Sequence, residues 1–299
     1  MWLAAFLWVR PSPFEPVWAK FLLLLAPLVL VPLGLRLITG LSKDNPWLGK
    51  LEVFQLPAAL LLGGALSQQP GWPAAALAFP WLTLTVILAL SQLVWLWQHR
   101  ASMALYEITS RSALMFLPVG GVWAVSDRLG FRPLDFEPVI VLLTAIHFHY
   151  AGFVLPLLTS FAMRQGNGAV GRVAAVAVVS GVPLVAAGIT TTQLKLGWWL
   201  ECIAAAWLGF GGILLAWLQA QLITRMQFPF VSRVLWMISA GSLFFSMFLA
   251  ILYGTRFYLP LSWLDIAWMR ALHGTANAVG FGGAGLLAWT IAGSSPQES

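Results

Sequence analysis

Residues 138–163 read PVIVLLTAIHFHYAGFVLPLLTSFAM, an apolar run without a single Asp, Glu, Lys or Arg. An α-helix rises about 1.5 Å per residue, so a helix of this length crosses the roughly 30 Å hydrocarbon core of a bilayer. His147, His149 and Tyr150 would then lie near the middle of the membrane. Polar groups at that depth are costly and usually functional. The stretch therefore predicts a membrane-spanning helix that carries a polar site.

The composition extends this interpretation to the whole chain. Of its 299 residues, 60% are hydrophobic and 9% are charged, whereas a soluble chain carries about 25% charged residues. The single cysteine, Cys202, excludes an intramolecular disulfide and a cysteine metal cluster. The net charge of +6 includes no basic run, so it indicates loops that face anionic lipid and gives no support to a nucleic-acid partner.

Apolar runs that could cross a membrane recur along the chain, and a span needs about 20 such residues. No linker between the runs is long enough to separate domains. We therefore predict an all-α polytopic bundle of about nine spans, forming one transmembrane domain over residues 1–299 with no soluble domain. The candidate spans are Trp18–Thr39, Leu51–Ser67, Ala74–Trp97, Ser102–Ser126, Pro138–Met163, Val170–Thr190, Gly197–Ile223, Ser232–Tyr253 and Ile266–Ile291.

The charges in the connecting segments predict how the bundle is oriented. Met1–Val9 is apolar but too short to span, and no basic residue precedes it, so we expect an interfacial segment rather than a signal peptide. One face collects nine lysines and arginines against seven on the other, which favours a cell-membrane protein with its N-terminus outside and its C-terminus inside. The nine are Arg36, Lys43, Lys50, Arg100, Arg111, Arg164, Arg172, Arg225 and Arg233.

Several polar residues share one depth in the predicted membrane. Spans five, seven and nine run in the same direction, so their depths can be compared from the helical rise. By that measure the polar residues lie roughly 6 to 16 Å from the start of their spans. We therefore expect a central polar cavity between these three spans. Its expected members are His147, His149, Tyr150, Glu201, His273 and Asn277.

Local spacing refines this expectation. His147 and His149 point in nearly opposite directions on a regular helix, so we expect one to face the cavity and the other to bond to a neighbouring helix. Pro156 cannot donate to the carbonyl of Gly152, so the helix is expected to open locally there. Small residues at Gly209, Gly211 and Gly212 favour close packing of span seven against its neighbours.

Acid–base chemistry suits these side chains better than metal chemistry does. Histidine titrates near neutral pH, and a desolvated glutamate can approach that range. Neither an HExxH, an HxxxH nor an ExxH spacing is present, so we predict no metal and no cofactor, although one or two histidines would suffice for haem. The candidate catalytic residues are His147, His149, Tyr150 and Glu201, and the candidate substrate-binding residues are His273, Asn277, Tyr253 and Asp127.

Two motifs resemble the YndJ-like family of bacterial polytopic membrane proteins. The first is IHFHYAGF at 146–153 and the second is LHGTANAVGF at 272–281, and their order, mid-chain and then last span, also fits. The resemblance implies a transporter-type protein in which His147, His149, Tyr150, His273 and Asn277 matter. It does not imply a mechanism.

Three functions are consistent with these features. The first is a transporter that binds a small or lipophilic solute, with proton coupling through histidine and glutamate. The second is a cofactor-free intramembrane enzyme that isomerises, hydrates or cyclises a lipid-soluble substrate. The third is a structural subunit whose polar residues only hold helices together. The expected partners are membrane lipid and a small or lipophilic ligand; the sequence does not indicate an oligomeric state.

Overall fold

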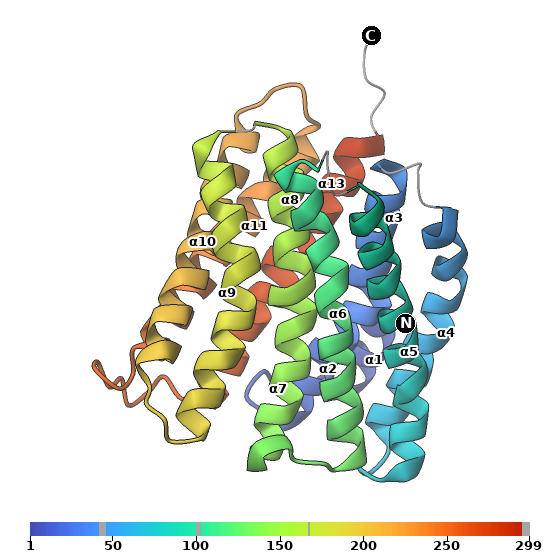
Figure 1. The fold of residues 1–299 in the computed structure, drawn as a ribbon, viewed down its shortest axis with the longest axis vertical. Coiled ribbons are helices and arrows are strands. Elements are labelled where there is room, and N and C mark those ends of the chain that lie inside the picture. Colours follow the sequence, from blue (N-terminus) through green and yellow to red (C-terminus); the bar gives the residue numbers. More distant parts are fainter. Residues whose placement is uncertain (42–45, 100–102, 167, 295–299) are drawn as a thin grey trace.

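The computed structural model describes residues 1–41, 46–99, 103–166 and 168–294, and within them the chain is helical with turns and short loops (Figure 1). The described residues contain no β-strand, which confirms the all-α class. Lys43 and Arg100, two of the charges counted for orientation, and Ser102, the expected start of the fourth span, lie outside the described residues, as does the side chain of Lys50.

The first half of the bundle runs to the long loop before residue 138. Its helices are α1 (Trp2–Val9), α2 (Pro16–Leu25), the π-helix η1 (Ala26–Leu30), α3 (Val31–Leu41), α4 (Pro46–Ser67), α5 (Trp72–His99), α6 (Leu105–Leu129) and the short 3₁₀ turn η2 (Pro133–Asp135). The second half contains α7 (Pro138–His149), the π-helix η3 (Tyr150–Val154), α8 (Leu155–Arg164), α9 (Ala169–Gln193), α10 (Trp199–Ile223), α11 (Phe230–Gly254), α12 (Ile266–Trp268), the π-helices η4 (Met269–Gly274) and η5 (Ala276–Gly283), and α13 (Ala284–Ser294).

Seven helical segments of the described chain are long and apolar enough to cross a membrane, which supports a multi-pass membrane protein. The other two expected spans are also helical. In α4 the apolar part is the shorter Leu51–Ser67, and residues 266–294 form one continuous helix from α12 to α13. The orientation of the termini remains a prediction, because the fold is the same whichever face is cytoplasmic. The seven segments are Pro16–Thr39, Trp72–His99, Leu105–Leu129, Pro138–Arg164, Ala169–Gln193, Trp199–Ile223 and Phe230–Gly254.

The helix of the fifth span is irregular just before Pro156, where the sequence predicts a local opening. Tyr150–Val154 is a π-helical turn, in which the N–H of Leu155 donates to the carbonyl of Tyr150, five residues back. Pro156 comes after Leu155 and has no N–H to donate, so the α-helical pattern cannot continue unchanged through this turn. The expected local opening is confirmed, and it lies immediately after the histidine pair.

Glycines bring α10 close to both of its neighbours. A Cβ on Gly211 would lie 2.9 Å from the Cβ of Ala177 on α9. A Cβ on Gly212 would lie 2.6 Å from the Cγ of Met247 on α11. Such separations are too short for real side chains, so only glycine permits this packing. The prediction that these glycines serve helix packing is confirmed.

The spans expected to surround a site do pack into one region. Span five contacts span nine through η3 and η5, and it contacts span seven through α8 and α10. Between spans seven and nine lies α11, which packs against α10 on one side and against η4, η5 and α13 on the other. Figure 1 shows this half of the bundle as the yellow, orange and red helices beside α7.

Candidate functional site

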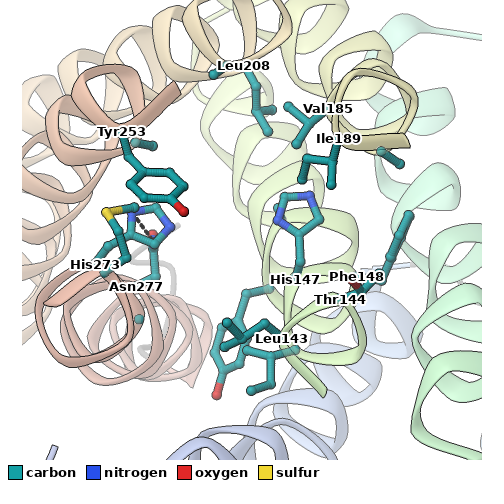
Figure 2. A pocket seen from close by; sticks show the side chains of 18 of the residues that line it. Leu143, Thr144, His147, Phe148, Val185, Ile189, Leu208, Tyr253, His273 and Asn277 are labelled. Atoms are coloured by element: carbon teal, nitrogen blue, oxygen red, sulfur yellow. Dashed lines mark hydrogen bonds between the residues drawn. The ribbon is translucent and has the colours of Figure 1, made fainter. Parts of the chain in front are cut away.

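A cavity of about 420 Å³ lies between α6, α7, η3, α9, α10, α11, η4 and η5. Most of its lining is aliphatic or aromatic, with Leu143, Val185, Ile189 and Leu208 among the side chains drawn in Figure 2. The prediction of a polar cavity is therefore wrong in this respect: the cavity is largely apolar, and only a few polar groups lie in its wall. The lining includes six of the proposed site residues, namely His147, Tyr150, Glu201, Tyr253, His273 and Asn277.

His147 projects from α7 into this cavity (Figure 2). Its Nε2 atom is buried and has no hydrogen-bond partner. Its ring stands edge-on to that of Phe148, with the centroids 5.7 Å apart. A buried polar atom without a partner costs free energy, and a bound molecule that forms a hydrogen bond with this nitrogen would remove that cost.

His149 points the other way and does not line the cavity. Its ring is fully buried and stacks on the indole of Trp81 on α5, with ring centroids 5.8 Å apart. The Nε1–H of Trp81 donates to Nε2 of His149 over 2.9 Å, so the Nδ1–H donates to the carbonyl of Ala145 over 2.7 Å. Both nitrogens have partners and the ring does not line the cavity, so nothing in the structure supports the catalytic role predicted for His149, which stays a prediction. The expectation that one histidine faces a cavity and the other bonds to a neighbouring helix is confirmed.

Tyr150 lines the cavity with its ring, but its hydroxyl is already engaged. The hydroxyl donates to the carbonyl of Leu22 on α2 over 2.7 Å. This bond joins two segments far apart in the sequence, and it ties the π turn to the first span. Tyr150 therefore supports the cavity wall, and donation to a substrate would require this bond to break.

Across the cavity, His273 belongs to a short polar network between η4, η5 and α11. Its Nδ1–H donates to the carbonyl of Ser246 over 2.8 Å, so its Nε2 accepts from the side-chain amide of Asn277 over 3.1 Å. The Ser246 hydroxyl in turn donates to Oδ1 of Asn277 over 3.0 Å. The network holds the imidazole of His273 in one orientation. It also holds the last helix against α11.

Glu201 contributes to the cavity as half of an ion pair. Its Oε1 lies 2.6 Å from Nη1 of Arg256, while its Oε2 is buried without a partner. The Arg256 guanidinium covers the ring of Tyr253 at 4.3 Å from the ring centroid. Tyr253 directs its hydroxyl into the cavity, on the same side as His273 (Figure 2).

Asp127 lies away from this site, contrary to the prediction that it binds substrate with the others. It forms an ion pair with the adjacent Arg128, with 2.6 Å between Oδ2 and Nη2. Arg128 also donates to the carbonyls of Ala65 and Gln68 at the end of α4. This cluster joins α4 and α6 at one end of the bundle and does not reach the cavity lining.

Two arginines in the lining, Arg256 and Arg270, were not among the predicted site residues. The sequence offered a signal for Arg270, since it precedes His273 by three residues, a spacing that places two side chains on one side of a helix. Arg256 lies in the loop after α11, and no local pattern relates it to Glu201. Among the described residues, no group of three or more His, Cys, Asp and Glu side chains could hold a metal ion.

Comparison with known proteins places the chain in a family. Residues 21–281 match the family model of the YndJ-like protein. A stretch of 95 residues is 33% identical to a protein of Bacillus subtilis (strain 168) named "Uncharacterized membrane protein YndJ", covering 32% of this chain and 16% of that relative. No solved structure matches the chain. Because the family model covers most of the sequence, including both histidine motifs and the cavity, the chain belongs to the YndJ-like family.

Proposed function

We propose that this protein is a transporter that binds a small lipophilic solute in the cavity between α7, α9, α10, α11 and η4. The cavity of about 420 Å³ falls within the usual range of ligand sites, roughly 300–1,000 Å³. Its composition also fits such a site, since ligand pockets are mostly apolar and carry a few placed polar groups.

The observation that carries the proposal is the unpaired Nε2 of His147. The other two histidines of the spans have partners for both nitrogens, whereas this one faces a cavity with a buried, unpaired atom. Unpaired buried polar atoms are rare because they lose the hydrogen bond that water provides in the unfolded chain. A solute that accepts from or donates to His147 removes this cost.

The backbone around the cavity favours movement over a rigid pocket. The lining includes residues of η3, η4 and η5, which are π-helical, and Pro156 is the second residue after η3. Such segments lack the regular α-helical bonds and recur at functional sites in helices. Transporters likewise place solutes beside interrupted helices.

The test compares bound molecules in two variants of the same helix. Ala250→Phe puts a ring into the cavity, because Ala250 lines it. Gly241→Phe adds the same ring on α11 at an exposed position where a Cβ meets nothing within 4 Å. Mass spectrometry of extracts from protein purified in mild detergent should find a lipophilic molecule in the wild type and in Gly241→Phe, and not in Ala250→Phe. Flux of that molecule in reconstituted vesicles should follow the same order.

Equal loading of all three proteins, or a wild type that is empty and inert toward a broad set of solutes, would contradict the proposal. The unpaired Oε2 of Glu201 and Nε2 of His147 in one cavity lining favour intramembrane acid–base catalysis as a second candidate. Recovery of a chemically altered molecule, lost in both His147→Ala and Glu201→Gln, would support the enzyme over the transporter.

A further inference from the structure

Arg270 is a buried guanidinium in the wall of the cavity. The residue is 6% exposed, and its Nε is buried without a hydrogen-bond partner. One terminal nitrogen donates to the backbone carbonyl of Phe14, in the loop between α1 and α2. A carbonyl accepts a hydrogen bond but does not neutralise a charge, and no carboxylate of the described residues lies within ion-pair distance of Arg270.

The charges of the cavity lining do not balance. Its charged side chains are Glu201, Arg256 and Arg270. Glu201 pairs with Arg256, and the one other ion pair of the described residues joins Arg128 to Asp127, so Arg270 takes part in neither. The lining therefore carries one positive charge in excess, beside a largely apolar surface.

An uncompensated charge buried among apolar groups is costly, and a bound counter-ion relieves that cost. We propose that the solute is a lipophilic organic monoanion whose carboxylate binds Arg270 and whose apolar part lies among the aliphatic side chains of the cavity. This assignment rests on the transporter function proposed above and names the chemical class of its solute. A single excess charge fits a carboxylate better than a phosphate monoester, which carries about −1.5 to −2 at pH 7.

Matched ten-carbon probes test the assignment. Decanoate and 1-decanol share an alkyl chain and differ in the charge of the head group. Each is titrated into the detergent-purified protein while the melting temperature is followed, since a ligand of the folded state raises it with concentration. In the wild type, decanoate should bind about tenfold more tightly than decanol, as a charge-assisted hydrogen bond is stronger than a neutral one.

Two arginine variants separate binding from folding. Arg270→Gln should abolish the preference for decanoate and leave decanol binding unchanged. Arg225→Gln is the matched control, because Arg225 also donates to a backbone carbonyl, that of Gln165 over 2.7 Å, and does not line the cavity. Its preference for decanoate should equal that of the wild type.

If Arg270→Gln does not fold, a third variant tests whether the charge of the cavity lining sets the preference for decanoate. Glu201→Gln releases Arg256 from its ion pair and adds a second uncompensated charge, so decanoate should bind more tightly while decanol does not change. An unchanged ratio of the two affinities in Glu201→Gln would overturn the assignment.

The outcomes also distinguish this inference from the proposed function. Equal binding of both probes to the wild type, blocked by Ala250→Phe, would overturn the anion and leave the cavity as a binding site. A destabilised Arg270→Gln that retains the full preference for decanoate would show that Arg270 only anchors the loop at Phe14. No binding of either probe would count against both proposals.

Discussion

Removing the His149 side chain should destabilise the protein far more than removing that of His147. His149→Ala deletes a fully buried ring and leaves the indole N–H of Trp81 without its acceptor. An unpaired buried donor costs about 1–3 kcal/mol, and with the space left by the ring the loss should reach roughly 3–5 kcal/mol. His147→Ala removes a group that has no hydrogen bond at Nε2 and borders a cavity, so its cost should stay within about 1 kcal/mol.

The assay is unfolding in mixed micelles, followed by helical circular dichroism as the fraction of denaturing detergent rises. A double-mutant cycle with Trp81→Phe isolates the contact, because that change removes the donor and keeps a ring. Trp81→Phe and His149→Ala should be non-additive by about 0.5–3 kcal/mol, the range for residues in contact. Equal losses in His147→Ala and His149→Ala, or strict additivity in the cycle, would refute the separate roles assigned to the two histidines.

Two further substitutions test positions outside the cavity. Asp127→Ala should lower the free energy of unfolding by roughly 3–5 kcal/mol, because it leaves the buried Arg128 without its carboxylate. The amount of bound solute should not change. A variant that loses the solute but keeps its stability would show that Asp127 belongs to the binding site. Gly211→Leu should lower stability by at least about 1–3 kcal/mol, since α9 and α10 meet at Ala177, and the same unfolding assay should find Gly241→Leu near wild type.

The features that depend on local sequence could be predicted well. Apolarity and length indicated the helices, because a bilayer imposes both. The two-residue spacing of His147 and His149 was enough to send their rings to opposite sides, and the missing N–H of Pro156 was enough to place an irregular turn before it.

What the sequence could not supply were contacts between distant segments. The hydroxyl of Tyr150 donates to the carbonyl of Leu22, and Glu201 of α10 pairs with Arg256, which follows α11. In both cases the partners lie far apart in the sequence, so no local pattern predicts them. Polar residues of several spans lie at a similar predicted depth in the membrane, but they do not all line the same cavity. Asp127 illustrates this, because it pairs with Arg128 near the end of α6 and is not part of the cavity lining, although Trp123, one turn earlier on the same helix, is.

The π turn at η3 affects how the fifth span would respond to a change in length. A π turn holds one residue more than an α turn, so deleting Ala151 should rotate α7 against α8 less than a deletion from a regular turn does. Deleting a residue from a regular turn instead rotates everything beyond it by about 100°. Within this span, the segment beside the cavity is therefore where evolution could shorten the chain while keeping His147 on its side of the helix.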